Sequence, residues 1–582
     1  MFDKIAFQKF VSNKQFLADS YTSFKNKIGL SSREDDYLKQ KNDVVLNWAY
    51  KDCVLEGGMT KEEKGKNEIF YNTILAPDEI TRLYAPKVFT SFEKWDSEAV
   101  KKGKAKKVTE IKNTDNFLIN GNNLLALHCL KKRYTGKVKL IYIDPPYNTE
   151  TNAFLYNNTF NHSTWLTFMK NRLEVAKSLL REDGIISIDI DHYELFYLGA
   201  LCDEIFGVEN RLGVVAVQHK PGGRQFASHF AVSHENKLVY AANKEKVGFY
   251  GLPVGAENIK RYTEKDELGK FKLRSLVRTG DASTKKESPT LWFPLYVNIK
   301  TKEISVDEIK KDYWIKVLPI DSRGVERCWR WGKEKIKEKW KSELVVSENK
   351  RKLQIHSKDR PSLTGRKKPT TMWMESGYAG TAGTSAIKGI FGDKVFTYPK
   401  SPYQVSDILE LATKEGDLVL DFFGGSGTTF DVAHKMKRRW IGIEQMDYVQ
   451  NVTKERLKKV IEGDQTGISE DVNWKGGGEF IYCEIKEWNE KYIQEICKAK
   501  TKDDIRKIYK AIKQEAFYRY DVDINGYDGK DFGALSLDDQ KDALCGCLDI
   551  NHLYVNYSER DDVRYKVTDE EKELTKKLLY GN

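Results

Sequence analysis

An acid, two prolines and a tyrosine stand where an apolar run ends, at Asp144, Pro145, Pro146 and Tyr147. The run itself, residues 139–143, is typical of a buried strand. Two consecutive prolines donate no sheet hydrogen bonds and have a restricted φ, so the strand must end there. A carboxylate that accepts hydrogen bonds and a phenol ring that stacks on flat ligands would then leave the sheet in a fixed relation. The tetrapeptide therefore predicts a rigid binding or catalytic group, with a strand-ending turn and a surface tyrosine as the alternative.

A second pattern, VLDFFGGSGTTF over residues 419–430, predicts a strand, a glycine turn and a helix. In its F-x-G-x-G core, formed by Phe423, Gly425 and Gly427, the glycines permit positive φ and a close approach of the backbone to a ligand. The helix that begins there presents free N–H groups. Glu444 ends the next predicted strand, 21 positions after Phe423, where an acid can accept both hydroxyls of a ribose. The pattern indicates a nucleotide-like cofactor, with a purely structural turn as the alternative.

The same turn distinguishes between cofactors. A dinucleotide site has G-x-G-x-x-G, whereas this turn is G-G-S-G-T-T, and the chain has no G-x-x-x-x-G-K-[ST] loop for a triphosphate. The acid Asp421, a phenylalanine before the first motif glycine and the lack of a phosphate-binding lysine suit a cofactor without phosphates. S-adenosylmethionine carries a ribose, an adenine, a sulfonium and an amino acid, whose ammonium group Asp421 could receive. We therefore predict S-adenosylmethionine as the cofactor.

These residues need a sheet to position them, and short β-rich runs predict one. The runs are residues 116–121, 139–144, 184–190, 212–218 and 237–242, followed later by 418–423 and 439–445. Between two of them, residues 163–183 carry apolar side chains at helical spacing. A strand, a helix and a strand in this order predict an α/β fold whose parallel sheet is covered on both faces.

The composition limits the class of protein. The 582 residues are 40% hydrophobic and 31% charged, which is typical of a globular chain with several domains. The net charge of +11 favours a polyanionic partner. The eight cysteines are scattered, which indicates free thiols in a reducing compartment and predicts no metal site. Because the chain shows neither a signal-peptide pattern nor a membrane-spanning run, we expect a cytoplasmic protein.

Residues 245–385 differ in character from the sequence on either side. Their β-rich periodicity fades, and basic clusters alternate with tryptophans, a composition that favours nucleic-acid binding. The tryptophans themselves are more often core residues than wedges between bases. As a group, the candidates for contacts to phosphates or guanine edges are Arg327, Arg330, Lys333, Arg351, Lys352, Arg366, Lys367 and Lys368.

Together, the tetrapeptide and the glycine turn resemble the motifs of the amino-group DNA methyltransferases. The resemblance implies that the tetrapeptide is catalytic and holds the exocyclic amine of a base extruded from double-stranded DNA. Asp144 would accept one N6–H of adenine and the carbonyl of Pro145 the other, which aims the nitrogen lone pair at the methyl group. Tyr147 would stack on the base, while Pro145 and Pro146 keep the three groups preorganised.

The motif order resembles that of the β class of these enzymes, because the tetrapeptide precedes the cofactor loop by 277 positions, counted from Asp144 to Asp421. This class implies a Rossmann-like class I S-adenosylmethionine-dependent methyltransferase fold with circularly permuted motif order. It also implies an inserted target recognition domain. Charged, helix-like stretches in residues 1–100 and from residue 486 onward predict helical extensions at both ends. The expected domains are an N-terminal helical extension (1–105), the catalytic part (106–244), the target recognition domain (245–385), the cofactor-binding part (386–485) and a helical C-terminal region (486–582) that could serve as a dimer or partner contact.

Further site residues follow from the resemblance. Asn122 stands after the strand 116–121, where relatives often carry Gly-Asp, and would approach the cofactor adenine. Lys400, Ser401 and Pro402 lie in a segment that resembles the part closing over the cofactor. The predicted cofactor set is Asn122, Lys400, Pro402, Asp421, Phe422, Phe423, Gly425, Gly427 and Glu444. The candidates for the lining of the target pocket are His219, Lys220 and Pro221.

Stretches along nearly the whole chain are similar to the modification (Mod) subunits of type III restriction-modification systems. Among them are KDCVLEGGMTKEE, GTAGTSAIKGIFG and LSLDDQKDALCGCLDINHLYVNYSERDD. The resemblance implies N6-adenine methylation on one strand of a short asymmetric site, a homodimer, and a separate Res subunit that carries ATP-driven translocation and cleavage. The alternatives are a stand-alone regulatory methyltransferase, a cytosine-N4 enzyme, a protein or RNA methyltransferase, and a DNA-binding specificity module with an inactive transferase site.

Overall fold

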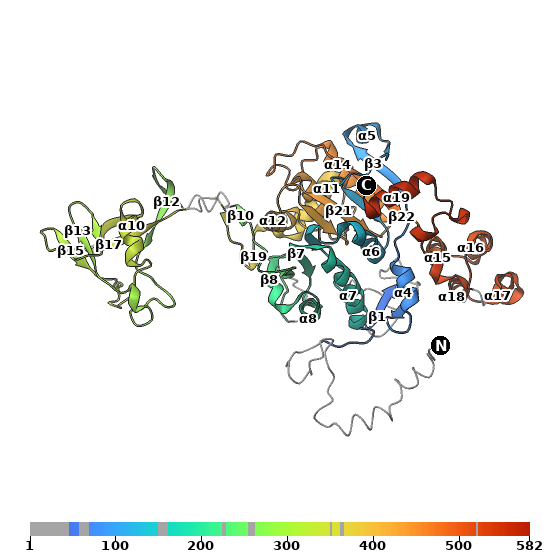
Figure 1. Ribbon diagram of the computed structural model, residues 1–582, viewed down its shortest axis with the longest axis horizontal. Helices are drawn as coiled ribbons and strands as arrows, with labels where there is room; N and C mark the ends of the chain where they lie inside the picture. Colours follow the sequence, from blue (N-terminus) through green and yellow to red (C-terminus); the bar gives the residue numbers. More distant parts are fainter. Residues whose placement is uncertain are drawn as a thin grey trace, which may run out of the picture. The chain divides into compact units, whose positions relative to one another are not determined.

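The computed structural model consists of two compact units (Figure 1). One unit combines Met1–Gly248 with Thr371–Asn582, and the other is Phe249–Thr370. The second unit lies within the residues 245–385 that the sequence sets apart as an insert. The residues that the structure describes are 46–56, 69–148, 161–223, 229–253, 262–349, 352–360, 366–519 and 522–581.

The first unit is built on an 11-stranded sheet with the order β19-β8-β9-β7-β6-β20-β21-β5-β22-β3-β4. Six adjacent strands of this sheet are parallel. They are β7 (Leu180–Ile190), β6 (Val138–Ile143), β20 (Leu418–Asp421), β21 (Arg439–Glu444), β5 (Phe117–Asn120) and β22 (Glu479–Ile485). Beyond β7, β9 (His234–Ala241) is antiparallel to both β7 and β8 (Arg211–Gln218), and β19 (Met372–Trp373) is parallel to β8. All residues of β6 and β20 are buried, as expected for parallel strands covered on both faces.

The glycine-turn strand β20 lies between β6 and β21, although it follows β6 only after the whole insert. Val419 of β20 is paired with Leu140 of β6, and on its other side Asp421 is paired with Gly442 of β21. Because β6 and β20 are parallel, their carboxyl ends lie at the same edge of the sheet. The tetrapeptide and the glycine turn are therefore brought together by strand pairing.

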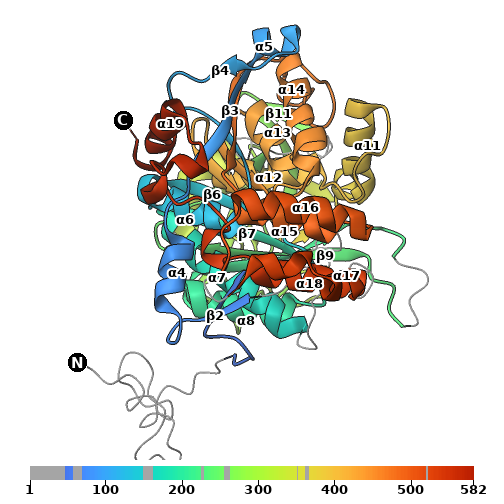
Figure 2. The same ribbon diagram turned by 90° about the vertical axis from the view of Figure 1, so that its right-hand side faces the viewer.

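Helices cover both faces of this sheet (Figure 1 and Figure 2). One group packs in series and consists of α6 (Asn123–Tyr134), α7 (Asn161–Leu179) and α8 (Leu195–Phe206). The other group consists of α12 (Pro402–Ala412), α13 (Thr428–Lys435) and α14 (Lys454–Glu462). Right-handed crossovers that leave β6 and β20 in opposite directions place their helices on opposite faces. The boundary between β6 and β20 is thus a topological switch point, where α/β sheets bind ligands.

The predicted helical extension over residues 1–105 is wrong for the part that the structure describes. Two short strands, β1 (Cys53–Glu56) and β2 (Ile69–Asn72), pair with each other, and β3 (Phe89–Asp96) extends the main sheet antiparallel to β22. The helices α4 (Pro77–Tyr84) and α5 (Ser97–Lys102) are short, and β4 (Lys106–Lys107) pairs with β3. Charged side chains suggested surface helices, but pairing with a distant strand overrides such local preferences.

The C-terminal region is helical, as predicted. Its helices are α15 (Asn489–Lys498), α16 (Lys502–Glu515), α17 (Lys530–Ala534), α18 (Leu537–Cys547) and α19 (Asp569–Tyr580). Of these, α15, α16 and α18 share a hydrophobic core of their own, whereas α19 packs on α6 and β3. None of the described helices is long and apolar enough to cross a membrane.

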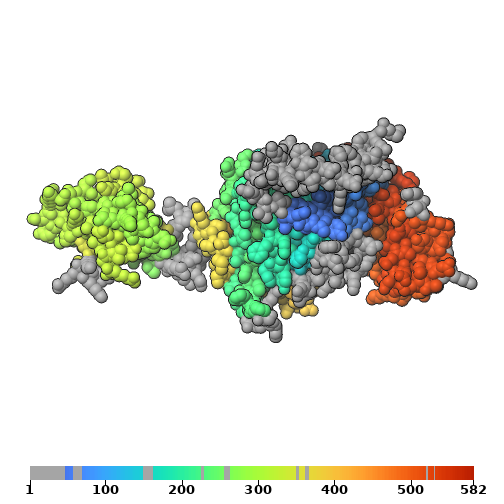
Figure 3. Space-filling view, turned by 90° about the horizontal axis from the view of Figure 1, so that it is seen from below, coloured from blue at the N-terminus to red at the C-terminus, as the bar shows by residue number. Residues whose placement is uncertain are grey.

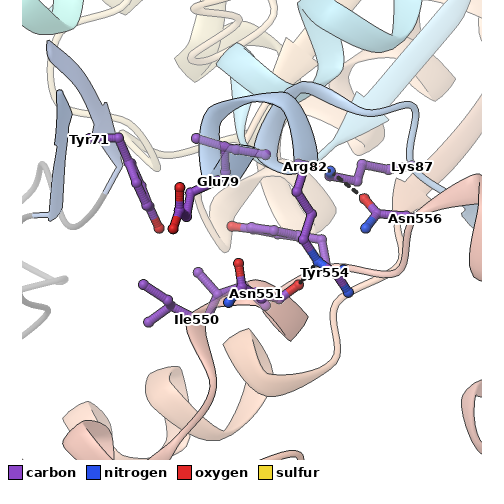
Figure 4. A pocket seen from close by; sticks show the side chains of 10 residues that line it. Tyr71, Glu79, Arg82, Lys87, Ile550, Asn551, Tyr554 and Asn556 are labelled. Atoms are coloured by element: carbon purple, nitrogen blue, oxygen red, sulfur yellow. Dashed lines mark hydrogen bonds between the residues drawn. The ribbon is translucent and has the colours of Figure 1, made fainter. Parts of the chain in front are cut away.

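The N-terminal and C-terminal segments of the first unit contact each other (Figure 3). The guanidinium of Arg82 in α4 lies 2.6 Å from the carboxylate of Glu559, and the ammonium of Lys87 donates to the side-chain carbonyl of Asn556 over 2.7 Å. A small pocket lies between these segments, lined among others by Tyr71, Glu79 and Tyr554 (Figure 4). Burial lowers the pKa of Lys87 to about 8. These contacts connect the N-terminal part of the described chain to its C-terminal region.

The second unit has its own small sheets and core. One sheet has the order β11-β12-β17-β16, another has β14-β13-β15, and α10 (Lys333–Glu343) accompanies them. The strands of this unit are β10 (Leu252–Pro253), β11 (Glu264–Asp266), β12 (Gly269–Ser275), β13 (Leu295–Asn298), β14 (Ile304–Ser305), β15 (Trp314–Val317), β16 (Leu344–Asn349), β17 (Lys352–Asp359) and β18 (Arg366–Lys367). Trp329 is buried in the core of the unit, as the sequence suggested for its tryptophans.

Candidate active site

The tetrapeptide leaves β6 in a conformation that α7 holds in place. Trp165 of α7 is fully buried and donates its indole N–H to the carbonyl of Pro146 over 2.8 Å. Within the described residues, no hydrogen bond is made to the carbonyl of Pro145. One proline carbonyl therefore anchors the loop, while the other keeps its acceptor capacity for a ligand.

The carboxylate of Asp144 combines a desolvated setting with partial access. Its side chain is 27% exposed, and its Oδ1 lies 3.3 Å from the ammonium of Lys400. Burial raises the pKa of Asp144 to about 6, with Asp189 and Glu235 adding to the rise and Lys400 opposing it. Asp144 is therefore mostly a carboxylate at pH 7 and mostly a neutral acid below pH 6. Only the ionised form accepts hydrogen bonds at both oxygens.

Lys400, predicted from the sequence to bind the cofactor, lies beside the tetrapeptide. Its Nζ atom contacts Asp144 Oδ1 at 3.3 Å, Asp189 Oδ2 at 3.3 Å, Glu235 Oε2 at 2.7 Å and the hydroxyl of Tyr147. Although burial disfavours the ammonium, the surrounding carboxylates raise the pKa of Lys400 well above its ordinary value. The residue is thus a fixed positive charge in the middle of an acidic group.

Sequence reasoning missed three charged residues of this site. Asp189 of β7 and Lys237 of β9 form an ion pair of 2.6 Å whose side chains are completely buried. Glu235 of β9 accepts a hydrogen bond from the hydroxyl of Tyr147 over 3.2 Å. Burial opposes ionisation of Glu235, but Lys400, Lys237 and His219 lower its pKa to about 2. The available signal concerned Asp189, a charged residue inside the otherwise apolar run 184–190, which is uncommon without a partner.

The glycine turn has the backbone conformation that its sequence requires. Gly425 and Gly427 have φ values of 51° and 79°, in the left-handed region that favours glycine. The N–H of Gly427 donates to the carbonyl of Gly424 over 2.8 Å, and α13 begins at the next residue. The turn therefore presents the start of a helix at the carboxyl end of β20, as predicted.

A buried polar network supports the turn from α14. Arg456 is fully buried and donates to the carboxylate of Asp431 over 2.8 Å, to the hydroxyl of Thr428 over 2.8 Å and to the carbonyl of Ser426 over 3.2 Å. These bonds link the second half of the turn to the first turn of α13. A satisfied network of this kind fixes one conformation of the loop.

Glu444 ends β21 beside the turn, at the position where the sequence predicts a ribose acceptor. Its carboxylate accepts main-chain N–H groups from Gly425 at 2.6 Å, Gln445 at 2.8 Å and Met446 at 3.0 Å. Burial raises its pKa, and these bonds together with one from Tyr448 oppose the rise. A carboxylate has about four acceptor sites, so a ribose diol would replace some of the present bonds.

Asp421 and the two phenylalanines after it differ in their roles. The carboxylate of Asp421 is 2% exposed and accepts the N–H of Phe423 over 2.9 Å. Burial raises the pKa of Asp421 to about 7, so protonation of this carboxylate competes with binding of a cation near neutral pH. Phe423 packs against Phe168 of α7 with ring centroids 5.8 Å apart, and Phe422 is completely buried in the core. Phe422 therefore supports the turn from the core.

Asn122 caps α6. Its side-chain oxygen accepts the N–H of Leu124 over 3.0 Å, while the next residue, Asn123, donates to the carbonyl of Phe422 over 2.8 Å. Pro402 is the first residue of α12, and the hydroxyl of Ser401 caps that helix by accepting the N–H of Tyr403. These residues occupy the ends of the elements around the glycine turn.

The target-pocket candidates lie at the end of β8. The carbonyl of His219 accepts the N–H of Gly380 over 3.2 Å, and the imidazole contributes to the low pKa of Glu235. Lys220 and Pro221 are exposed in the turn that follows. His219 is thus electrostatically connected to the charged group around Lys400, whereas the other two residues face solvent.

The basic candidates of the insert differ in their surroundings. Arg327 and Arg330 are engaged within the unit, with the carboxylate of Asp321 and the carbonyl of Ser275 respectively, each at 2.9 Å. The side chains of Lys367 and Lys368 are exposed. Lys333 lies over the ring of Phe293, Arg366 donates to the carbonyl of Gly251, and Arg351 and the side chain of Lys352 lie outside the described part of the chain.

The insert carries the net positive charge of the chain. Residues 249–370 hold 30 of the 97 basic residues and 17 of the 86 acidic ones, so their net charge is +13 and that of the remainder is −2. A polyanion is therefore attracted to the second unit more than to the first.

The chain is similar to known DNA-modifying proteins. Residues 138–455 match the family model described as DNA methylase, and residues 1–30 match the one described as type III restriction/modification enzyme methylation subunit. A protein named as the HindVI Mod subunit, of a type III restriction-modification enzyme of Haemophilus influenzae, is 34% identical over 98% of this chain and 89% of its own length. The EcoPI Mod subunit of Escherichia phage P1 is 34% identical over 59% of each chain. The type II methyltransferase M.KpnI of Klebsiella pneumoniae is 34% identical over 56% of this chain and 78% of its own.

Proposed function

Because the chain belongs to the DNA methylase family and, within it, to the methylation (Mod) subunits of type III restriction-modification enzymes, we propose that it methylates adenine N6 in double-stranded DNA. S-adenosylmethionine is the methyl donor. The observation that carries the adenine assignment is the accessible carboxylate of Asp144 at the switch point, one strand from the glycine turn.

The tetrapeptide supplies what a weak amine nucleophile needs. The lone pair of an exocyclic amine is conjugated with the ring, so the nitrogen attacks poorly unless it is pyramidal. Asp144 accepts one N–H and the carbonyl of Pro145 accepts the other, which favours that geometry. The lone pair then forms a bond to the methyl carbon, the electron pair of the broken C–S bond remains on sulfur, and the methylated amine loses one proton to water. Tyr147 offers its ring to the extruded base.

The residues around the glycine turn fit the donor by their chemistry. Asp421 provides a carboxylate for the ammonium group, and Glu444 provides one for the ribose hydroxyls. Gly425 and Gly427 leave the backbone open to close approach, since neither carries a side chain. The two carboxylates end adjacent parallel strands, β20 and β21, so they face the same edge of the sheet as Asp144.

The remaining assignments concern partners. The insert, with its net charge of +13, is the target recognition domain that reads the asymmetric DNA site. The subunit acts as a homodimer and joins a Res subunit that carries ATP-driven cleavage. The C-terminal helices α15, α16 and α18, which have a core of their own, are the candidate surface for these contacts. Sedimentation of the purified chain, alone and with Res, tests both assemblies.

The central experiment measures methyl transfer by Asp144 variants. Tritiated S-adenosylmethionine and mixed-sequence duplex DNA are supplied to the wild type, to D144A and to D144N, and the modified nucleoside is identified after digestion. We expect N6-methyladenine from the wild type and a loss of about 100-fold or more in both variants, since removal of one preorganised hydrogen-bonding group from a catalytic site costs about that factor. Cofactor binding and thermal stability of the variants serve as controls for folding. Transfer at near-normal rates by D144A, or N4-methylcytosine as the product, would contradict the proposal.

A further inference from the structure

The ammonium of Lys400 lies where four acceptors from three separate elements converge. Asp144 and Tyr147 follow β6, Asp189 belongs to β7, and Glu235 belongs to β9. The shortest of these ion pairs joins Lys400 to Glu235 at 2.7 Å. The carboxylates of Asp144 and Asp189 each lie 3.3 Å from the same ammonium. Such convergence on one nitrogen exceeds what is needed to bury a lysine, which requires a single partner.

We propose that Lys400 is a positioning residue for methyl transfer, whose charge keeps Asp144 in the ionised form that accepts the target amine. This inference rests on the proposed function, because it assigns a task to Lys400 within the reaction that Asp144 performs. It differs from the expectation drawn from the sequence, in which Lys400 contacts the cofactor.

The balance of charges in the site supports this role. Among the residues that the structure describes, three carboxylates, those of Asp144, Asp189 and Glu235, face two ammonium groups, those of Lys237 and Lys400. Lys237 is committed to Asp189, since this pair is 2.6 Å apart and wholly buried. Lys400 is therefore the cation that separates Asp144 from Glu235. Without it, two carboxylates would share a desolvated space, and one of them would take up a proton.

Asp144 is the carboxylate that would become protonated. Its pKa is raised to about 6, whereas that of Glu235 is lowered to about 2, so Asp144 is already the easier of the two to protonate. A neutral carboxyl donates a hydrogen bond from one oxygen, and a donor cannot hold an N–H group of the target amine at that oxygen. Loss of the charge at residue 400 would thus leave Asp144 with one weaker, neutral acceptor oxygen in place of two charged ones, without changing the residue itself.

The backbone around Lys400 is held rigidly, as a positioning role requires. The hydroxyl of Ser401 donates to the carbonyl of Gly377 over 2.6 Å and also caps α12. The carbonyl of Lys400 accepts a hydrogen bond from the hydroxyl of Thr428, the first residue of α13, over 3.4 Å. A side chain at Gly383 would clash with the carbonyls of Pro399 and Lys400, which shows how closely α11 (Gly380–Phe391) approaches this segment.

Other titratable groups also face this site, and their effects on the pH dependence must be distinguished from that of Lys400. The phenol of Tyr142 donates to Asp189 over 2.6 Å, and Asp421 interacts electrostatically with Asp144 from β20. His219, at the end of β8, acts on Glu235. Tyr147 faces Asp144 and Glu235 with a pKa raised far above 10 by burial, so it remains neutral throughout the range of the experiment.

The test is the pH dependence of kcat/KM for methylation of duplex DNA between pH 5 and pH 9.5. For the wild type we expect activity to fall as the pH decreases through about 6, where Asp144 becomes neutral. In K400M the acid limb should move up by about 1 to 3 pH units, the range by which a close opposite charge shifts a carboxyl pKa. Activity at pH 7 should then drop about 2- to 90-fold, depending on how far the limb moves, and recover in part by pH 9. K400R, which keeps the charge, should keep the acid limb near that of the wild type.

A double variant and a matched control make the test specific. E235Q removes the carboxylate that Lys400 separates from Asp144, so E235Q/K400M should recover activity at pH 7 relative to K400M. K139M replaces another buried lysine, whose Nζ lies 3.0 Å from Asp183 at the opposite end of β6, and should leave the acid limb in place. Binding of S-adenosylhomocysteine in the absence of DNA, measured by calorimetry, should be similar in K400M and the wild type.

Two results would overturn the inference while leaving the proposed function intact. One is an acid limb that stays near pH 6 in K400M together with a large loss of cofactor binding, because Lys400 would then act on the cofactor. The other is a uniform loss of activity at all pH values that E235Q does not relieve, because the role of Lys400 would then be purely structural. Failure of the proposed function is recognised separately, by a wild-type protein that transfers no methyl group to DNA.

Discussion

Carboxyl groups of the same intrinsic chemistry differ strongly in proton affinity at this site. The pKa of Asp421 is raised to about 7 and that of Asp144 to about 6, both chiefly by burial, whereas that of Glu235 is lowered to about 2. The difference follows from the number of cations that each group contacts. Glu235 has Lys400 at 2.7 Å, while the hydrogen bonds that Asp421 accepts from described residues come from neutral groups, the main chain and Thr429. Asp421 is therefore suited to a cationic ligand, which would supply the missing charge.

Replacing Asp421 by asparagine should stabilise the protein at pH 8 while weakening cofactor binding. A folded pKa above the unfolded value means that ionisation destabilises the fold progressively as the pH rises from about 4 to about 7. D421N removes this penalty, so its melting temperature should exceed that of the wild type at pH 8 and approach it near pH 4. The gain in free energy of unfolding is bounded by about 4 kcal/mol, which corresponds to a pKa of about 7 in the folded protein against about 4 in the unfolded chain.

The control for this prediction is D471N, which changes an exposed aspartate of the same unit. It should alter the melting temperature little at either pH. A D421N protein that is less stable than the wild type at pH 8 would show that Asp421 already has a cationic partner in the free protein. Calorimetric titration with S-adenosylhomocysteine should show a loss of affinity in D421N alone.

At the scale of elements, the position of the tetrapeptide depends on α7 as much as on β6. The strand delivers Asp144 to the edge of the sheet, but the strand itself ends at Ile143. Trp165, on the second turn of α7, holds the following loop through the carbonyl of Pro146. The loop therefore combines the restricted φ of two prolines with one long-range hydrogen bond. Both constraints lower the cost of holding the acceptors in place.

The variant W165F should reduce the rate of methyl transfer more than it reduces stability. Phenylalanine fills most of the buried space but donates no hydrogen bond, so the carbonyl of Pro146 loses its partner at a cost of about 1 to 3 kcal/mol. We expect kcat to fall about 10-fold with cofactor affinity unchanged, because the lost hydrogen bond affects the geometry of the loop that carries the tetrapeptide. Single-turnover kinetics and thermal unfolding measure the two effects.

W488F is the matched comparison. Trp488 is also buried and donates its indole N–H to a carbonyl, that of Glu515 at 3.2 Å, but it lies in the C-terminal region. It should lower stability to a similar degree and leave kcat unchanged. Equal kcat values for W165F and the wild type would show that the prolines alone suffice to hold the loop.

At the scale of the whole molecule, charge is divided between the two units. The net charge is +13 for residues 249–370 and −2 for the rest. The acidic remainder contains the candidate site, which is rich in carboxylates, while the basic unit attracts polyanions. Under the proposed function, DNA binding and chemistry belong to different parts of the chain, and salt should affect binding far more than the chemical step.

Neutralising two exposed lysines of the insert should weaken DNA binding in a manner that depends on salt. In K367A/K368A the slope of log K against log salt concentration should decrease by about 1 for each phosphate contact that is lost. Fluorescence anisotropy with a mixed-sequence duplex, over a range of salt concentrations, measures this slope. The double variant K500A/K576A removes two exposed lysines of the first unit and should keep the wild-type slope. Identical slopes for both double variants would place the DNA contacts elsewhere.

The local features of the site follow from the amino-acid sequence alone. Two prolines after an apolar run dictate a strand end at residue 143, and glycines with a following helix pattern dictate the turn at Gly425 and Gly427, whose φ values are positive as expected. These features follow from constraints on single residues and their immediate neighbours. The resemblance of the motifs led to the family, and the charged, helix-like character of the C-terminal stretch predicted its helices.

Which distant residues come into contact depends on the tertiary structure. It placed β20 beside β6, inserted β3 into the main sheet where helices were expected, and brought Lys400 to Asp144 together with Asp189 and Glu235. Strand pairing and the pKa of a buried group depend on neighbours that lie hundreds of residues away along the chain, so no local pattern encodes them.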